Sequence, residues 1–244
     1  LFLRIFVAQS PIMSEEDKVI PIAMPGTHER FLEHFEKLNL PVGAKILDIG
    51  AGHGAFSKQL HEMGFEVHAC DLFPEIFHFK EIECRKVDIT HPFPYEENQF
   101  DLVLAIEVSE HILDHENLFR EAKRILKPEG RFCLSTPNVL SLKSRVRYLF
   151  GGFFNSFHKL DYENFNGLQH INARSLDQYG YCAVKNGFKA PSFEIDRKQS
   201  TSRWIYVFIG LFMRPFRAYR KISSFHNQKK LLFGRLLFLT FEKS

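Results

Sequence analysis

The stretch KILDIGAGHG, residues 45–54, joins an apolar run to three glycines at alternate positions. Its apolar residues at 46, 47 and 49 predict a central strand of a parallel sheet, because strands buried on both faces are almost continuously hydrophobic. The glycines allow a sharp turn and let the backbone approach a ligand closely. Residues 55–63 then follow a helical pattern, so the turn leads to free N–H groups at a helix N-terminus. This order predicts a nucleotide-type site at the carboxyl end of a sheet, with a plain strand-to-helix turn as the alternative.

Three later segments repeat the arrangement of a strand that ends at an acidic residue. Residues 66–70 precede Asp71, residues 82–87 precede Asp88, and residues 100–106 precede Glu107. An acid after the second strand is placed to accept hydrogen bonds from two ribose hydroxyls. The repetition favours a ligand site over a plain turn. The G-x-G-x-G spacing differs from the G-x-G-x-x-G of dinucleotide-binding proteins and disfavours a nicotinamide-dependent dehydrogenase.

Five motifs, in the same order, resemble those of class I S-adenosylmethionine-dependent methyltransferases. They are ILDIGAGHG, HACD, KVDI, FDLVLAIEVSEH and LKPEGRFCLSTPN, and they extend over residues 45–138. The resemblance implies an α/β fold with a Rossmann-like, seven-stranded, mostly parallel sheet and helices on both faces. The last strand would be antiparallel and lie between strands five and six. S-adenosyl-L-methionine is the implied cofactor.

The resemblance also implies which residues surround the methionine portion of the cofactor. The backbone of Gly50, Ala51 and Gly52 would line it. Asp48 would orient the ammonium group, directly or through water. Glu107 would border the same portion from the end of the fourth strand.

A second group of residues is implied for the nucleoside portion. Asp71 would accept the ribose hydroxyls, with Leu72 beside the adenine. Asp88 would accept a hydrogen bond from the exocyclic amine, and the backbone N–H of Ile89 would meet a ring nitrogen. A role for the two aspartates as simple strand-end caps is the alternative, which the collective pattern disfavours.

The segment EVSEH, residues 107–111, is expected on the turn beside the transferable methyl group. Together with His170 it resembles the metal set of small-RNA 3′-terminal 2′-O-methyltransferases, and a similar E-x-x-E-H occurs in ubiquinone-biosynthesis O-methyltransferases. A divalent metal bound there would lower the pKa of a hydroxyl and orient it. Without a metal, His111 is the candidate catalytic base, because the pKa of free histidine lies near neutrality. A structural role for His111, capping the helix and packing on the sheet, is the third alternative.

The predicted function is O-methylation of a small or lipid-linked molecule. An RNA methyltransferase is a second hypothesis, but HINARS at residues 170–175 lacks the further histidines of the RNA enzymes, and no RNA-binding module is present. Nucleic acid is therefore disfavoured as a partner. A non-catalytic scaffold is a third hypothesis, against which the intact glycines and strand-end acids argue. The sequence leaves the oligomeric state open.

Charge is distributed unevenly along the 244 residues, whose net charge is +3. Residues 1–139 hold 14 Lys and Arg against 23 Asp and Glu, a net −9, whereas residues 140–244 hold 18 against 6, a net +12. Within the basic part, WIYVFIGLFM at 204–213 is too short to span a bilayer. Because four cations follow it, an interfacial membrane anchor over 204–221 is one hypothesis, and a buried helix that packs on the sheet or on a dimer partner is the other.

The sequence divides into an N-terminal extension, 1–25, and a methyltransferase domain, 26–244. The domain has core motifs at 45–138, a basic and aromatic cap insertion at 139–170 and an apolar and basic insertion at 200–230. Residues 1–8 are too short to span a bilayer and lack a convincing signal pattern, and Met13 is a candidate start. Four widely spaced cysteines indicate a reducing cytoplasm, with peripheral membrane contact as an addition.

Further elements are predicted by range. A helix opens at Thr27 with the threonine as its cap, another opens near Pro74, and an amphipathic helix covers 114–126. His28 is expected at the surface, with a position facing the cofactor as the alternative. The remaining predicted elements are a strand at 131–135, a helix from 170 to about 185, and strands at 188–195 and 231–242.

Overall fold

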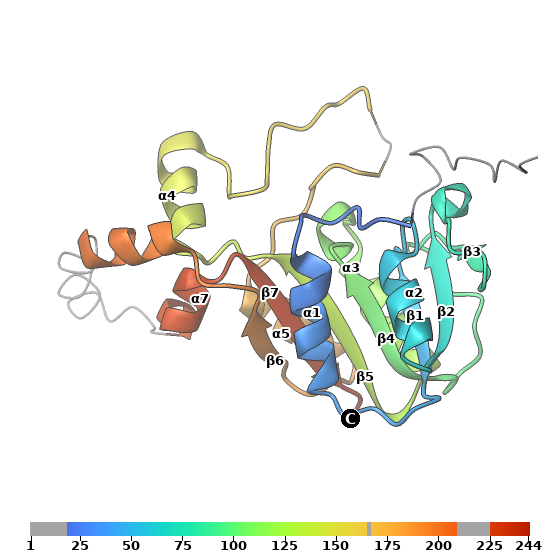
Figure 1. Cartoon of the computed structure of the whole chain (residues 1–244). Helices are drawn as coiled ribbons and strands as arrows, with labels where there is room; N and C mark the ends of the chain where they lie inside the picture. Colours follow the sequence, from blue (N-terminus) through green and yellow to red (C-terminus); the bar gives the residue numbers. More distant parts are fainter. Residues whose placement is uncertain (1–18, 165–166, 209–224) are drawn as a thin grey trace, which may run out of the picture.

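A computed structural model describes residues 19–164, 167–208 and 225–244. The strands within these ranges form one seven-stranded sheet (Figure 1). The strand order is β3-β2-β1-β4-β5-β7-β6. The first five strands pair in parallel, and β7 pairs antiparallel with both β5 and β6. The predicted fold class is therefore confirmed. The strands are β1 Lys45–Ile49, β2 Glu66–Asp71, β3 Cys84–Lys86, β4 Phe100–Ile106, β5 Leu126–Pro137, β6 Ser192–Ile195 and β7 Leu236–Glu242.

Helices cover both faces of this sheet, and each face has its own apolar core. One core joins α1 Thr27–Glu36 and α2 Ala55–Glu62 to strand residues such as Ile46 and Leu104. The other joins α3 His115–Ile125 and α5 Leu176–Lys185 to residues such as Leu47 and Val103. Neighbouring strand residues point to opposite faces, which is why the central strands are apolar at nearly every position.

Helix starts follow local capping chemistry. The side chain of Asp114 accepts a hydrogen bond from the Asn117 N–H, so α3 begins directly after it. Ser175 and Gln178 form a capping box at α5, which therefore begins at Leu176. The prediction that this helix starts at residue 170 is wrong by six residues for that reason.

The predicted threonine cap of α1 is also wrong. Gly26 occupies the N-cap position with φ of +81°, and Thr27 is the first residue of the helix. The Thr27 hydroxyl instead accepts a hydrogen bond from the Arg235 guanidinium at 3.0 Å. The helix predicted near Pro74 is a single 3₁₀ turn, Pro74–Ile76.

The last strands are shorter than predicted. The sheet pairing of β6 begins at Ser192, directly after Pro191, whose nitrogen carries no hydrogen to donate to a ladder. Residues 231–233 belong to a short helix, α7 Lys229–Phe233, and β7 starts only after Gly234. The predicted antiparallel position of the last strand between β5 and β6 is confirmed.

The predicted insertions contain a helix that the sequence analysis did not assign. This helix, α4 Leu142–Gly151, is capped by Ser141 and ends at Gly152 in the left-handed region. Residues 200–208 are helical, while the rest of the predicted anchor, 209–221, lies outside the described residues. In the part of the chain that the structure describes, no helix is both long and apolar enough to cross a membrane.

Candidate active site

A cavity of about 950 Å³ opens at the carboxyl ends of β1, β2 and β4. Residues 50–53 of the glycine loop and residues 20–24, which precede α1, line it. Residues 167, 168, 170 and 171 also line it. All of the residues predicted to bind the cofactor, and His111, line this one cavity, with Asp48, Gly50, Ala51, Gly52, Asp71, Leu72, Asp88, Ile89 and Glu107 among the lining residues.

The glycine loop requires glycine at two positions for steric reasons. Gly50 and Gly52 have φ of +69° and +53°, a region that side chains rarely adopt. A Cβ at Gly50 would lie 2.4 Å from Val108 Cγ2, and one at Gly52 would lie 2.8 Å from Ile22 Cδ1. The loop therefore keeps its backbone open to the cavity only while these positions lack side chains.

Asp71 links the glycine loop to the end of β2. One carboxylate oxygen accepts a hydrogen bond from the Gly52 N–H at 2.9 Å, and the other accepts from the Phe73 N–H at 2.9 Å. Each carboxylate oxygen can accept more than one hydrogen bond, so the half-buried group keeps capacity for a ligand. The backbone bonds hold the carboxylate in one orientation at the cavity wall.

Asp48 lies beneath the loop and is buried. Its Oδ2 accepts a hydrogen bond from the Ser57 hydroxyl at 2.6 Å, which joins β1 to α2. Burial raises the pKa of Asp48 to about 7, against the opposing effect of the Ser57 hydrogen bond. A cation placed beside this carboxyl group would therefore favour its ionised form at neutral pH.

Asp88, Leu72 and Ile89 also line the cavity. Asp88 is exposed, and hydrogen bonds from Thr90 hold the pKa of its carboxyl below the usual value. The Asn117 side chain donates to the Ile89 carbonyl at 2.8 Å and to the His91 carbonyl at 2.9 Å. The sequence analysis missed Asn117, whose only sequence signal is its place in the first turn of α3.

Glu107 occupies a strained backbone position at the end of β4. Its φ is +56°, and its N–H donates to the Ser135 hydroxyl at 2.9 Å. Burial raises the pKa of its carboxyl group. Glu107 Oε1 has no hydrogen-bond partner among the described residues, so this oxygen can accept a hydrogen bond from a ligand.

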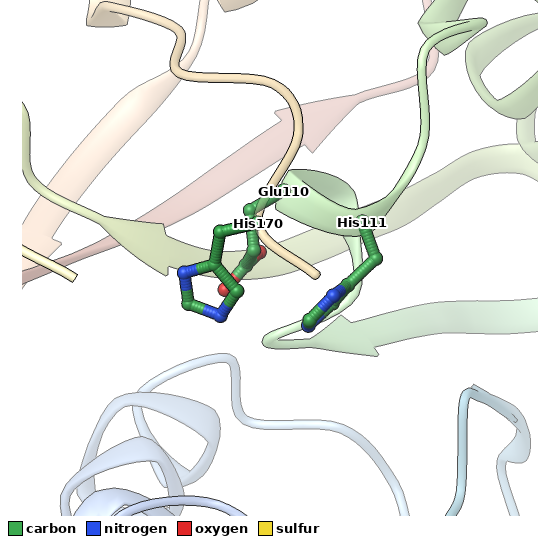
Figure 2. A group of neighbouring side chains, drawn as sticks. All are labelled: Glu110, His111 and His170. Carbon is green, nitrogen blue, oxygen red and sulfur yellow. The ribbon is translucent and has the colours of Figure 1, made fainter. Parts of the chain in front are cut away.

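The side chains of Glu110, His111 and His170 converge, and the two histidines line the cavity. One potential ligand atom from each lies within 4.8 Å of the others, and Figure 2 shows both rings extending to the same side of the turn that carries Glu110. The Glu110 carbonyl accepts hydrogen bonds from Ile171 and Asn172, which holds the segment after His170 against this turn. The sequence analysis paired Glu110 with His170 by resemblance, and the structure brings them together.

Burial shifts the pKa of each of the three side chains toward its uncharged form. Burial, reinforced by Glu107, raises the pKa of Glu110 well above its usual value. Burial lowers the pKa of His111 and takes that of His170 to about 4. Both imidazoles are thus neutral at pH 7 and each keeps a lone pair, which suits either proton acceptance or metal ligation.

Buried hydroxyl groups lie behind Glu110. The Tyr179 hydroxyl lies 2.8 Å from the Ser109 hydroxyl and 3.2 Å from that of Thr136. All three residues are buried, and Ser109 precedes Glu110. These contacts fix the short 3₁₀ turn, Ser109–His111, that carries the site. Tyr179 gave no sequence signal, because a tyrosine on the apolar face of a helix reads as core.

His28 lines the cavity, so its expected place at the surface is corrected. Its ring packs edge-on against Phe56 with centroids 5.4 Å apart, and burial lowers its pKa. The reason is that residues 20–24 pass over the glycine loop, which brings the start of α1 to the mouth of the cavity. The alternative position facing the cofactor site is the one observed.

A family model described as a methyltransferase domain matches residues 24–192. The chain belongs to this methyltransferase family. The match covers more than half of the chain and includes every predicted cofactor residue, so the resemblance to class I S-adenosylmethionine-dependent methyltransferases is confirmed.

Curated relatives match a shorter part of the methyltransferase. This chain is 32% identical over 116 residues to the ubiquinone biosynthesis O-methyltransferase of Xanthomonas axonopodis pv. citri, and the match covers 44% of this chain and 48% of the relative. A second such protein, from Xanthomonas oryzae pv. oryzae, is 31% identical over 105 residues. The methyltransferase chain thus spans about half the length of the curated relatives that it matches.

Solved structures agree with the fold of the methyltransferase. A SAM-dependent methyltransferase from Archaeoglobus fulgidus has a TM-score of 0.58 at 18% identity and covers 88% of this chain and 94% of its own. A protein described as a putative sarcosine dimethylglycine methyltransferase, from Galdieria sulphuraria, has a TM-score of 0.56 at 17% identity and covers 89% and 84%. At these identities the likeness concerns the fold.

Proposed function

We propose that this chain transfers the methyl group of S-adenosyl-L-methionine to an oxygen atom of a small molecule. The observation that supports this most directly is the shared cavity, which is lined by the glycine loop, the strand-end acids and His111, whose pKa is lowered by burial. The O-methyltransferase names of the curated relatives point to the same reaction class.

Three features of the cavity suit this cofactor. Its volume of about 950 Å³ exceeds what one ligand of nucleoside size needs, and leaves room for a second small molecule. Gly50 and Gly52 line the cavity without a Cβ, which lets a ligand approach the backbone closely. Asp71 and Asp88 present carboxylates where nucleoside hydroxyl and amine groups would donate.

Several residues of the chain would hold the cofactor, and one would accept a proton. Asp71, Asp88 and Ile89 would hold the nucleoside, while Asp48 and Glu107 would face the methionine portion. When bound, S-adenosylmethionine supplies an electrophilic methyl carbon, which an oxygen nucleophile attacks in line. His111 would take the hydroxyl proton at Nε2, because Nδ1 lies 3.1 Å from the Gln169 carbonyl. Positioning alone contributes several powers of ten in rate.

A divalent metal is the second candidate arrangement for the same three side chains. Glu110 Oε1 and His170 Nδ1 are buried and have no partner among the described residues, and Glu110, His111 and His170 each place one potential ligand atom within 4.8 Å of the others. Such a metal would be held by Glu110, His111 and His170 and would lower the pKa of the acceptor hydroxyl. The two arrangements exclude each other for His111, since a lone pair bound to a cation accepts no proton.

The lining of the cavity favours a neutral acceptor. Within the described ranges no Lys or Arg lines it, whereas five acidic residues do. Anionic substrates, RNA included, would meet like charge there. A lipid-linked acceptor, a cytoplasmic location, the division at residues 25 and 26 and membrane contact over 204–221 stay predictions; only 204–208 of the last belong to the described residues.

Calorimetric titration with S-adenosylmethionine and, separately, NADH tests the cofactor assignment. Binding of the first in the micromolar range, without binding of the second, is the expected result. Transfer of a labelled methyl group to a panel of neutral phenols and catechols then tests the reaction. Transfer only to phosphorylated or carboxylated acceptors would contradict the proposal, and so would binding of NADH alone.

A further inference from the structure

The carboxyl end of α4 presents large apolar side chains to solvent. Leu149 is 75% exposed and Phe150 is 84% exposed. Tyr148 is half-exposed and stacks on Phe154 with ring centroids 4.4 Å apart. Single exposed apolar residues are common, but a contiguous group at a protruding helix end marks an interaction site.

The helix over 200–208 adds a second apolar group at the same end of the molecule, where Figure 1 shows it in orange near α4. Trp204 and Phe208 are each 69% exposed. Tyr206 packs against Phe233 of α7 with centroids 5.4 Å apart, which attaches this helix to the body of the protein. Arg145 of α4 donates to the Asn227 side chain at 2.8 Å, so both apolar groups are tied to the segment around α7.

The sequence segments that contain these two helices carry charge of one sign. Residues 139–160 contain four Lys and Arg and no Asp or Glu, and residues 197–241 contain ten and none. Lys143 and Arg203 are exposed, and Arg147 is half-exposed. Aromatic side chains among cations, without carboxylates, match the interface of an anionic lipid bilayer. A second copy of this chain would bring the same positive charge and is disfavoured as the occupant.

We propose that α4 and the helix over 200–208 together form a docking surface for an anionic membrane. Its apolar residues would enter the headgroup region, and its cations would meet lipid phosphates. This goes beyond the proposed function, because no residue of the docking surface lines the cavity. The docking surface consists of Tyr148, Leu149, Phe150, Phe153, Trp204, Val207 and Phe208, with Lys143, Arg147 and Arg203.

Flotation of the full chain with vesicles tests the docking surface. We compare phosphatidylcholine vesicles with vesicles containing 30% phosphatidylglycerol, at low and at high salt. The wild type should bind the anionic vesicles only, and less at high salt. The double variants Leu149→Ser with Phe150→Ser, and Trp204→Ser with Phe208→Ser, should each lower the vesicle partition coefficient at least tenfold.

A matched control replaces exposed apolar residues elsewhere. Tyr181→Ser with Val184→Ser on α5 removes side chains that are 74% and 54% exposed, and it should leave vesicle binding unchanged. All variants should keep the wild-type thermal midpoint and cofactor affinity, which separates this test from that of the proposed function. The proposal is overturned if the wild type does not bind anionic vesicles or binds neutral vesicles equally well. It is overturned too if the Trp204→Ser, Phe208→Ser variant loses binding while the Leu149→Ser, Phe150→Ser variant does not. It is also overturned if the wild type is a dimer that the variants dissociate.

Discussion

His111 Nδ1 lies 3.1 Å from the carbonyl oxygen of Gln169, a residue 58 positions later in the chain. In a neutral imidazole this contact makes Nδ1 the donor and leaves the lone pair on Nε2, toward the cavity. The loop that carries Gln169 therefore sets the tautomer of the proposed catalytic group.

Replacement of His111 by glutamine should lower kcat by about 10²–10⁴-fold, the usual contribution of a general acid or base. Cofactor affinity should change little, because His111 is not among the residues proposed to hold the cofactor. Single-turnover kinetics and calorimetry measure the two quantities. His68→Gln, which alters a histidine outside the cavity, is the control and should retain full activity. Equal loss in both variants would contradict the assignment.

Chelation distinguishes the two candidate roles of His111. If His111 is the base, EDTA should leave the rate unchanged, and the acid limb of the pH profile should lie below pH 6.5, because burial lowers its pKa from that value. If a metal is bound, EDTA should abolish activity and Mn²⁺ should restore it. His170→Ala should then weaken Mn²⁺ binding, measured by electron paramagnetic resonance, by at least tenfold. Unaltered binding in that variant would exclude this metal site.

Replacement of Asp71 by alanine should weaken cofactor binding by roughly 1–3 kcal/mol, through loss of charge-assisted hydrogen bonds to the ribose. The same change also releases the Gly52 and Phe73 N–H groups, so part of the effect reaches the glycine loop. Isothermal titration gives the affinity. Glu96 is exposed, and Glu96→Ala is the control that removes one carboxylate elsewhere. An equal loss of cofactor affinity in that variant would contradict the assignment of Asp71.

Acid should destabilise the fold through His34. Burial lowers the pKa of His34 from 6.5 to about 4, and its Nε2 lies 2.9 Å from the Thr240 hydroxyl. The unfolded chain therefore binds more protons than the folded one below pH 6.5, and stability falls as the pH drops from 6.5 toward 4. His34 should contribute about 1–3 kcal/mol to this fall.

Urea unfolding at pH 7 and at pH 4.5 measures the effect, with His34→Gln as the comparison. The variant should be less stable than the wild type at pH 7, and its stability should depend less on pH over this interval. The raised pKa of Asp48 favours the folded state as the pH falls below 7, which opposes the effect of His34. Because both proteins contain Asp48, the difference between them reports on His34. An identical pH dependence in both proteins would show that His34 does not titrate on unfolding.

The gathering of the proposed cofactor residues at one cavity was predictable because its signals are local in sequence. Gly50, Asp71 and Asp88 lie at or just after the ends of β1, β2 and β3, and parallel strands bring their carboxyl ends to one edge. The position of His28 depended on where residues 20–24 cross the glycine loop, which no periodicity encodes.

Other parts of the site depend on tertiary contacts. The position of the Tyr179 hydroxyl results from the packing of α5 behind β5, and Glu110 Oε1 has no partner among the described residues; neither leaves a pattern in the sequence. α4 was missed because Tyr148, Leu149 and Phe150 face solvent and only Leu142 is a buried apolar residue, so there is no inward stripe.

The place of β7 in the sheet sets an order of assembly during synthesis. β5 pairs with β7 over residues 131–137, so that edge stays open until residues 236–242 have left the ribosome. β6 precedes β7 in the chain, yet in the sheet it pairs only with β7. More than a hundred residues after β5 must therefore emerge before the sheet can close, and in that interval a bare apolar edge is exposed. A nascent chain of this protein should accordingly be a client for chaperones that shield strand edges.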